Sequence, residues 1–388
     1  MSPVKAALLP AGFEDMLPPI AKQESWLIGQ LLNSFDSYGY QRVKPPLLEF
    51  EQSLVSGTGV AVAEQTFRLM DPVSQRMLGV RADMTAQIAR IARTRLDALA
   101  RPLRISYSGQ VVRVQGNQIR PNRQFSQAGA ELIGAEGNSR FPALTETIDL
   151  ALTALKRLGI DKMSIDLTLP KLTSYLLSEL DYSEEVRVQL IKALDQKDTA
   201  EINRLAGGNQ ELLIGLVQAA GPAELVLQKL NAMSLPKSIT QDFGNIAELI
   251  SVIQAAHHEV TVTLDPVEQR GFQYHEGIGF TFYSGSAGAE LGTGGEYRVH
   301  YGEEDDRGEA ASGFTFYSDA LLEVAQADPP VRSIYLAANT KAEEALTLRA
   351  DGWITIKQLE NDDSDLRTLA QKFNCGFVFA NGEIKALD

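Results

Sequence analysis

The chain has 388 residues, of which 44% are hydrophobic and 22% are charged, a balance typical of a soluble globular protein with a large core. Its formal net charge of −14 argues against a broad basic surface for nucleic acid. Pro10 and the Glu14–Asp15 pair interrupt the first apolar run before a signal-peptide core forms. No later stretch offers the roughly 18 apolar residues of a membrane span. We therefore expect a cytoplasmic protein.

Cysteine and histidine are scarce in this sequence. The single cysteine, Cys375, excludes an internal disulfide, and the four histidines are too few and too scattered for a structural metal site. His257 and His258 are adjacent and leave a helical pattern, so we predict that they lie on the surface. We expect neither a metal nor a cofactor.

The first elements combine a helix with a strand. Apolar residues from Leu27 to Tyr38 recur at spacings of three to four, which predicts an amphipathic helix that ends at Gly39. The run YQRVKPPLLEF then predicts a strand at a sheet edge, because proline cannot donate a ladder hydrogen bond. Residues 83–100 show a second helical pattern.

A predicted hairpin follows this second helix. RISYSGQVVRV and RQFSQAGAELIGA are strand-like, and the Gly, Asn and Pro of the intervening QGNQIRPN favour a loop between antiparallel strands. A helix around residues 142–158 leads to a short strand near MSIDLTL.

The composition then changes. Between about residues 171 and 256, Leu, Ala, Gln and Glu recur at helical spacing, which predicts a helical insertion. Strand patterns return at HEVTVTLDP and continue through GIGFTFYSG to GFTFYSDAL.

The last residues form a separate pattern. After the QADPP linker, strands and helices alternate to the end of the chain. We therefore predict a core over residues 1–325, which contains the helical insertion at about 171–256, and a small C-terminal α/β domain over 331–388.

Four segments resemble the histidyl-tRNA synthetase family of class II aminoacyl-tRNA synthetases. In chain order they are LLPAGFEDMLP, VRADMTAQIAR, the pair QVVRV and RQFSQAGAELIG, and RGFQYHEG. Together they cover most of residues 8–321, and the ordered set is far more specific than any single segment. The resemblance implies an α+β fold, in which a class II synthetase-like antiparallel sheet is flanked by helices.

The same resemblance implies a histidine-binding pocket made of Asp83, Thr85, Arg113, Gln127, Glu131, Arg270 and Tyr274. In the family, the positions of Asp83, Thr85 and Gln127 bind the α-amino group, and a carboxylate, a hydroxyl and an amide oxygen suit an ammonium. Glu131 lies four residues past Gln127 on one strand, hence on the same face, and could accept from the imidazole N–H. The guanidinium of Arg270 could hold the carboxylate.

Each residue also has a simpler interpretation. An Asp-x-Thr sequence at Asp83 is often only a helix N-cap. Arg113 and Arg270 are compatible with ordinary surface charges, and Glu131 with the outward residue of an edge strand. The joint occurrence of these residues in the family order favours the pocket.

Several positions depart from the synthetase pattern. Adenylate formation requires cations around the ATP phosphates. The family's GFGLGLERL is GFTFYSDAL here, with Ala320 at the arginine position, and GGRYDGL is GGEYRVHYG, with Glu296 at a second arginine. Gln115 stands where the FRxE pattern has its acidic residue. The resemblance thus implies a core without aminoacylation activity.

Two departures concern the histidine pocket itself. Asp83 is one methylene shorter than the glutamate of the family, and His275 occupies one of two tyrosine positions, which leaves Tyr274. The resemblance therefore supports membership of the family more directly than it supports histidine binding in this pocket.

A silent core with a shortened tail resembles the regulatory subunits of ATP phosphoribosyltransferase, a family of histidyl-tRNA synthetase paralogues. Residues 331–388 are too few for a full anticodon-binding domain, so we expect no tRNA partner. The resemblance implies a homodimer inside a hetero-oligomer with the short-form catalytic subunit, in the first step of L-histidine biosynthesis, with histidine as the feedback effector. An active histidyl-tRNA synthetase, or another paralogue acting in translation control or protein modification, remains the alternative.

Overall fold

The computed structural model describes residues 9–55, 57–118, 120–233, 235–269, 275–300, 308–327, 332–360 and 365–387. Its contacts divide the chain into two compact units, Met1–Gln326 and Ala327–Asp388, and we describe each by itself. None of the helices in these ranges has the length and apolar character needed to cross a membrane.

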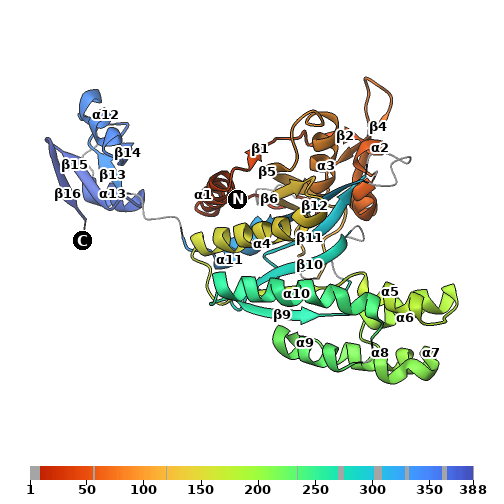
Figure 1. The fold of residues 1–388 in the computed structure, drawn as a ribbon. Helices are drawn as coiled ribbons and strands as arrows, with labels where there is room; N and C mark the ends of the chain where they lie inside the picture. Colours follow the sequence, from red (N-terminus) through yellow and green to blue (C-terminus); the bar gives the residue numbers. More distant parts are fainter. Residues whose placement is uncertain are drawn as a thin grey trace, which may run out of the picture. The chain divides into compact units, whose positions relative to one another are not determined.

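The first unit is built on a large mixed sheet (Figure 1). In the described part of the chain this sheet has nine strands, in the order β1-β5-β6-β12-β11-β10-β7-β9-β8. In that order they are Gln41–Arg42, Leu103–Val112, Gln124–Ile133, Glu309–Tyr317, Gly292–Val299, His275–Ser284, Met163–Thr168, Thr261–Asp265 and Gly221–Pro222. β1 is parallel to β5 and β7 to β9, while the central strands are antiparallel.

Helices α1 (Ile20–Ser37) and α4 (Arg140–Arg157) cover one face of this sheet, and α10 (Lys237–Ala256) runs beside α4 (Figure 1). The predicted apolar stripe of α1 is confirmed, because Leu27 and Phe35 are fully buried. The ring of Phe35 meets that of Phe314 on β12 edge to face, with centroids 5.6 Å apart.

The opposite face carries α3 (Thr85–Thr94), whose Ile88 belongs to a second apolar cluster with Tyr107 of β5. Strand alternation assigns the side chains of β6 to the two faces. Ala128 and Ala130 join the cluster under α1 and α4, whereas Gln127 and Glu131 point to the other side.

The Pro-bearing segment after α1 forms two strands in two sheets. We predicted one edge strand, but only β1 joins the edge of the large sheet, and β2 (Leu48–Phe50) pairs with β4 (Met77–Val80), which also pairs with β3 (Phe67–Met70). Pro45 and Pro46 lie between β1 and β2, outside both ladders, because proline has no backbone N–H to donate. Helix α2 (Glu51–Leu54) and the 3-10 helix η1 (Gly57–Gln65) follow β2.

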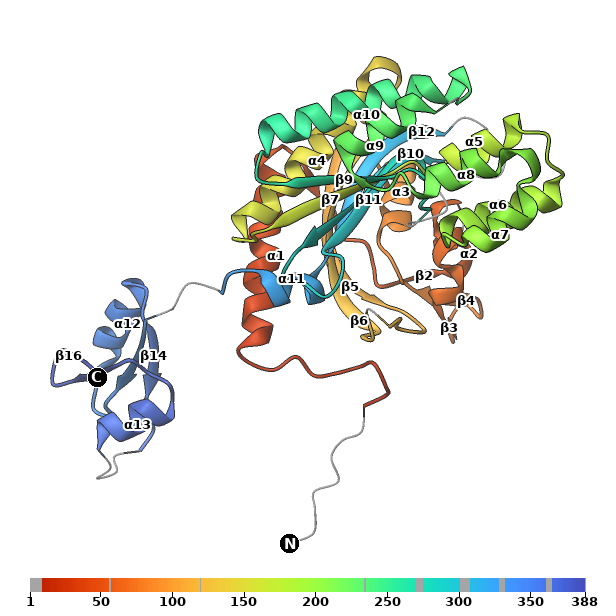
Figure 2. The same ribbon diagram turned by 90° about the horizontal axis from the view of Figure 1, so that it is seen from below.

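Short helices dominate the stretch between β7 and β9, and several of them gather to one side of the sheet (Figure 2). Before α10 they are α5 (Leu172–Glu179), α6 (Glu184–Asp195), α7 (Thr199–Leu205), α8 (Gln210–Val217) and α9 (Ala223–Ala232), and the 3-10 helix η3 (Gly207–Asn209) precedes α8. Another 3-10 helix, η2 (Gly137–Ser139), lies outside this stretch, directly before α4. The surface prediction was wrong for His257, which is buried with its Nε2 2.8 Å from Oδ1 of Asp149. His258 is exposed as predicted.

In residues 332–360 and 365–387, the second unit forms a four-stranded sheet with two helices. The order is β14-β13-β15-β16, in which the first three strands are parallel and β16 is antiparallel. Its elements are β13 (Ser333–Leu336), α12 (Ala342–Ala350), β14 (Ile354–Lys357), α13 (Leu366–Lys372), β15 (Phe377–Ala380) and β16 (Glu383–Ala386). We did not predict β16, a strand of four residues whose side chains are all exposed.

Candidate functional site

The start of α3 is tied to β6 by a buried polar group. Oδ1 of Asp83 accepts the N–H of Thr85 at 2.9 Å, which satisfies a free donor in the first turn of the helix. Oδ2 accepts from Nε2 of Gln127 at 2.8 Å, and Oε1 of Gln127 accepts the N–H of Met84 at 3.1 Å. The N-cap residue of α3 is Met84, so Asp83 lies one position before the cap and takes part in this polar group.

Glu131 lies at the centre of the same face. The hydroxyl of Tyr107 donates to its Oε1 at 3.1 Å, and that of Tyr297 to its Oε2 at 2.9 Å. The Tyr107 hydroxyl is also 2.6 Å from Oγ1 of Thr315. Burial raises the pKa of the Glu131 carboxyl to about 8, although the two tyrosine hydrogen bonds act in the opposite direction. At neutral pH the carboxyl is therefore mostly protonated.

Glycines form the sheet surface beside Glu131. Cα pairing across four strands aligns Glu131 with Gly313, Gly295 and Gly279 in one row. The carboxylate lies directly over Gly313, where an added Cβ would be 1.5 Å from Oε2. Any other residue at 313 would displace Glu131, so this glycine is required for the position of the carboxylate.

Four predicted pocket residues belong to this buried group, namely Asp83, Thr85, Gln127 and Glu131. The hydroxyls of Thr85 and Tyr107 are 3.5 Å apart and connect the helix start with Glu131. Within the described ranges, no three His, Cys, Asp or Glu side chains come together as a metal site. The group offers hydrogen-bond donors and acceptors and no metal ligand set.

The other three predicted residues are not placed in this group. Nε of Arg113 donates to the carbonyl of Ala82 at 3.3 Å, so its guanidinium lies beside the segment that leads into α3. Arg270 and Tyr274 fall outside the described residues, as does the side chain of His275. The carboxylate-binding role of Arg270 stays a prediction.

Sequence reasoning missed the two tyrosines that hold Glu131. Tyr107 pairs with Gly129 across β5 and β6, two positions from Glu131 along the strand, while Tyr297 comes from β11, two strands away from β6. Both tyrosines lie in strand-like sequence, and a buried tyrosine hydroxyl usually needs a hydrogen-bond partner. This was the signal from which a contact with a buried polar group could have been predicted.

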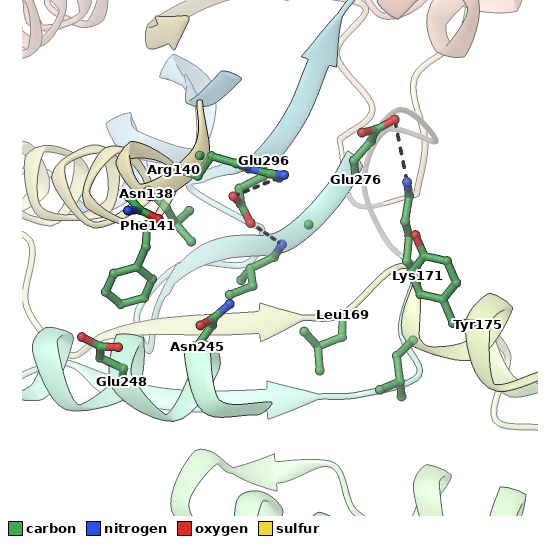
Figure 3. A pocket seen from close by; sticks show the side chains of 15 residues that line it. Asn138, Arg140, Phe141, Leu169, Lys171, Tyr175, Asn245, Glu248, Glu276 and Glu296 are labelled. Atoms are coloured by element: carbon green, nitrogen blue, oxygen red, sulfur yellow. Dashed lines mark hydrogen bonds and ion pairs between the residues drawn. The ribbon is translucent and has the colours of Figure 1, made fainter. Parts of the chain in front are cut away.

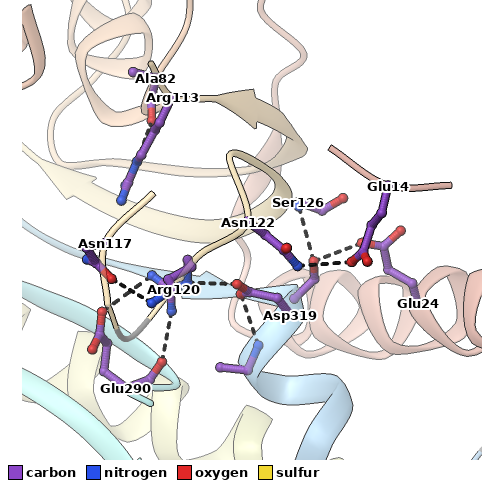
Figure 4. Close-up of polar contacts among 12 residues, drawn as sticks. Glu14, Glu24, Ala82, Arg113, Asn117, Arg120, Asn122, Ser126, Glu290 and Asp319 are labelled. Atoms are coloured by element: carbon purple, nitrogen blue, oxygen red, sulfur yellow. Dashed lines mark hydrogen bonds and ion pairs between the residues drawn. The ribbon is translucent and has the colours of Figure 1, made fainter. Parts of the chain in front are cut away.

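Arg120, in the connection between β5 and β6, is buried among acidic groups of its own chain (Figure 4). Its Nε lies 2.8 Å from Oδ2 of Asp319, and its Nη1 lies 3.4 Å from Oε1 of Glu290. The guanidinium carbon is 4.0 Å from the ring centroid of Tyr317, within cation–π distance. The charge of Arg120 is therefore already neutralised inside the protein.

Side chains fill the junction between β12 and α11 (Ser318–Val324). Thr315 and Tyr317 stand at two glycine positions of the family pattern GFGLGLERL. Tyr317 is buried, and its hydroxyl lies 3.0 Å from Oγ1 of Thr293. Ala320, at the arginine position, is buried in the first turn of α11. The two glycine positions of the pattern thus carry larger side chains here, and the arginine position carries an uncharged one.

Glu296, which we expected to change the charge near a nucleotide, lies on the face of the sheet opposite to Glu131. Its neighbour Gly295 belongs to the glycine row, so strand alternation turns Glu296 to the opposite side. There Oε1 lies 3.3 Å from Nη2 of Arg140, and Oε2 accepts the N–H of Ile278 at 3.1 Å.

Known proteins are similar to this chain in sequence and in fold. Residues 12–321 match the histidyl-tRNA synthetase family. The ATP phosphoribosyltransferase regulatory subunit of Rhodospirillum centenum is 44% identical over 98% of this chain and 96% of its own, and that of Paramagnetospirillum magneticum is 44% identical over 91% of each. The crystal structure of an ATP phosphoribosyltransferase regulatory subunit/histidyl-tRNA synthetase from Bacillus halodurans superposes with a TM-score of 0.80 and 25% identity, covering 96% of this chain and 97% of that one. The class II synthetase-like fold is thereby confirmed, and the chain belongs to the ATP phosphoribosyltransferase regulatory subunits, within the histidyl-tRNA synthetase family.

Proposed function

We propose that this chain is a non-catalytic subunit that binds the short-form catalytic subunit of ATP phosphoribosyltransferase and conveys feedback by histidine in the first step of L-histidine biosynthesis. The observation that carries the proposal is the alignment, over almost the whole length of both chains, with relatives that are named as regulatory subunits of this enzyme.

Histidine is the proposed effector, with its ammonium beside Asp83, Thr85 and Gln127 and its imidazole at Glu131. The hydrogen bonds from the two tyrosines fix the Glu131 carboxyl over Gly313. A protonated carboxyl can donate to a neutral imidazole nitrogen, and a charged one can accept from its N–H. Arg270 would hold the ligand carboxylate.

The proposed lack of aminoacylation rests on where the cations are. Moving Arg120 onto a triphosphate would leave Asp319 and Glu290 without their ion pairs, and breaking a buried pair costs about 3–5 kcal/mol. Ala320 supplies no cation, and Tyr317 fills the adjoining space. Arg113 alone is a weak counterion for a triphosphate, whose transition state spreads charge over several oxygens.

A role without tRNA is supported by charge. Residues 327–388 contain ten Asp and Glu against seven Lys and Arg, a net charge of −3. Binding of nucleic acid depends on neutralising phosphates with clustered Lys and Arg. The C-terminal unit therefore lacks the charge that an anticodon-binding surface needs.

A homodimer is proposed for the region that follows α1. Apolar side chains are exposed along the small sheet and its connections, among them Leu47, Leu48, Met70 and Val73. Exposed apolar patches of this kind mark protein interfaces, and two copies related by a two-fold axis would bury the same patch on both.

Co-purification tests the proposal directly. The chain is expressed with the short-form catalytic subunit of the same genome, and phosphoribosyl transfer to ATP is measured for each subunit alone and for the mixture, with and without histidine. We expect co-elution and activation of the catalytic subunit. Separate elution would contradict the partnership, whereas histidine-dependent ATP–pyrophosphate exchange by this chain alone would contradict only the lack of catalysis.

A further inference from the structure

A cavity of about 560 Å³ lies between the large sheet and helices α4, α5 and α10 (Figure 3). Its sheet wall is the start of β10, with Gly277 and Ile278, together with Glu296 of β11. The volume is within the range of about 300–1,000 Å³ that small-molecule sites occupy.

This cavity is separate from the Glu131 pocket, because the two lie on opposite faces of the same strands. Gly279 and Gly295 belong to the row that begins at Glu131. Their neighbours Ile278 and Glu296 point the other way and line the cavity. A ligand here would touch none of Asp83, Thr85, Gln127 and Glu131, which do not line the cavity.

Buried aliphatic side chains line the bottom of the cavity. Leu144 of α4, Leu169 and Leu172 next to α5, and Ile278 of β10 all line it, and each is less than a tenth exposed. Phe141, at the start of α4, also lines the cavity, and Figure 3 shows its ring on the same side as Glu248. A ligand would therefore bury an apolar or aromatic body against this wall.

Charged groups surround the apolar part. Arg140 and Glu296 form an ion pair with a 3.3 Å separation at one end, and Lys171 and Glu276 form one of 3.7 Å at the other (Figure 3). Glu248 of α10 also lines the cavity, and no described residue forms a hydrogen bond or ion pair with its carboxylate. Both lining cations are thus paired, and Glu276 has a second partner in Arg298, 3.4 Å away. Among the described lining residues, the exposed Glu248 is the carboxylate without an ion pair to a described residue.

We infer that this cavity binds a small organic cation with an aromatic or aliphatic body. A cation would meet the unpaired Glu248, whereas an anion would compete with carboxylates for Arg140 and Lys171. The ring of Phe141 and the partly exposed ring of Tyr175 add faces that attract a cation. The net charge of −14 favours the same sign of ligand.

Tryptamine and indole-3-propionate are suitable probes, because they share a ring and differ in the sign of their charge. Calorimetric titration of the full-length protein is expected to give at least about tenfold tighter binding for tryptamine. Glu248→Gln should weaken tryptamine binding about two- to fivefold, because Glu248 is exposed and solvent screens its contact with a cation. Asn245→Trp, at the exposed mouth on α10, should abolish it.

Glu185→Gln, an exposed carboxylate on α6, is the matched control and should bind tryptamine like the wild type. Circular dichroism confirms that each variant is folded. Equal binding of the two probes would overturn the cationic preference. Undiminished tryptamine binding by Asn245→Trp would place the ligand elsewhere, and no binding by the wild type at millimolar tryptamine would overturn the site itself.

Discussion

Glu131→Gln tests how the proposed histidine pocket uses protons. The substitution keeps the size of the side chain and its place between Tyr107 and Tyr297, but it removes the group whose pKa is raised to about 8. Free histidine carries an imidazole with a pKa of about 6.5. The wild-type pocket and the variant should therefore differ in how their affinity for histidine depends on pH.

Between about pH 6.5 and 8 the free pocket holds one proton on Glu131 and the free imidazole holds none, so the bound pair can share that proton without net exchange. Affinity should be flat and maximal in this window. Below it histidine must release a proton, and above it the pocket must take one up, and each limb weakens binding up to about tenfold per pH unit. In Glu131→Gln the upper limb disappears.

The loss of the shared proton also weakens binding inside the window. A hydrogen bond between neutral groups contributes about 0.5–1.5 kcal/mol, which corresponds to roughly a two- to tenfold weaker affinity of Glu131→Gln at pH 7.2. Calorimetric titration with histidine from pH 6 to 9 measures both effects. The ammonium of histidine titrates equally with both proteins, so the ratio of their affinities isolates Glu131. Identical affinities and identical pH profiles would refute a role of this carboxyl in binding.

Further predictions concern stability and assembly. Because folding raises the pKa of Glu131, the stabilising contribution of this carboxyl is fully present below about pH 4.5 and is lost as pH rises through about 8. In the wild type, the free energy of unfolding in urea should therefore fall between pH 5.5 and 8 by up to roughly 1.4 kcal/mol per pH unit. In Glu131→Gln this fall should be smaller. Gln127→Ala strands Asp83 and should cost about 1–3 kcal/mol by the same method, with unchanged stability arguing against the buried network. Arg120→Ala should cost about 3–5 kcal/mol, and a loss below 1 kcal/mol would mean that its ion pairs are screened by solvent. Leu47→Asp should turn a dimer into a monomer in light scattering at micromolar concentration, whereas a dimeric variant would place the interface elsewhere.

Local patterns in the sequence determined the main elements and the family. The apolar spacing of α1 and the turn residues between β5 and β6 act within a few residues of each other, so they could be recognised without the fold. The same holds for Gln127 and Glu131, since strand periodicity alone puts residues four apart on one face. Motifs in family order then identified the histidine pocket as a hypothesis.

The tertiary structure decided what these side chains contact. Glu131 was compatible with an edge strand, but β6 lies inside the sheet, with β5 on one side and β12 on the other. The two tyrosines that hold Glu131 come from β5 and β11, and the carboxylates that neutralise Arg120 lie 170 and 199 residues away along the chain. His257 was predicted at the surface because it leaves the helical pattern, but its partner Asp149 on α4 lies 108 residues away along the chain. Register between distant strands and burial under distant helices set hydrogen bonds, charge and pKa, and neither is encoded in the spacing of neighbouring residues.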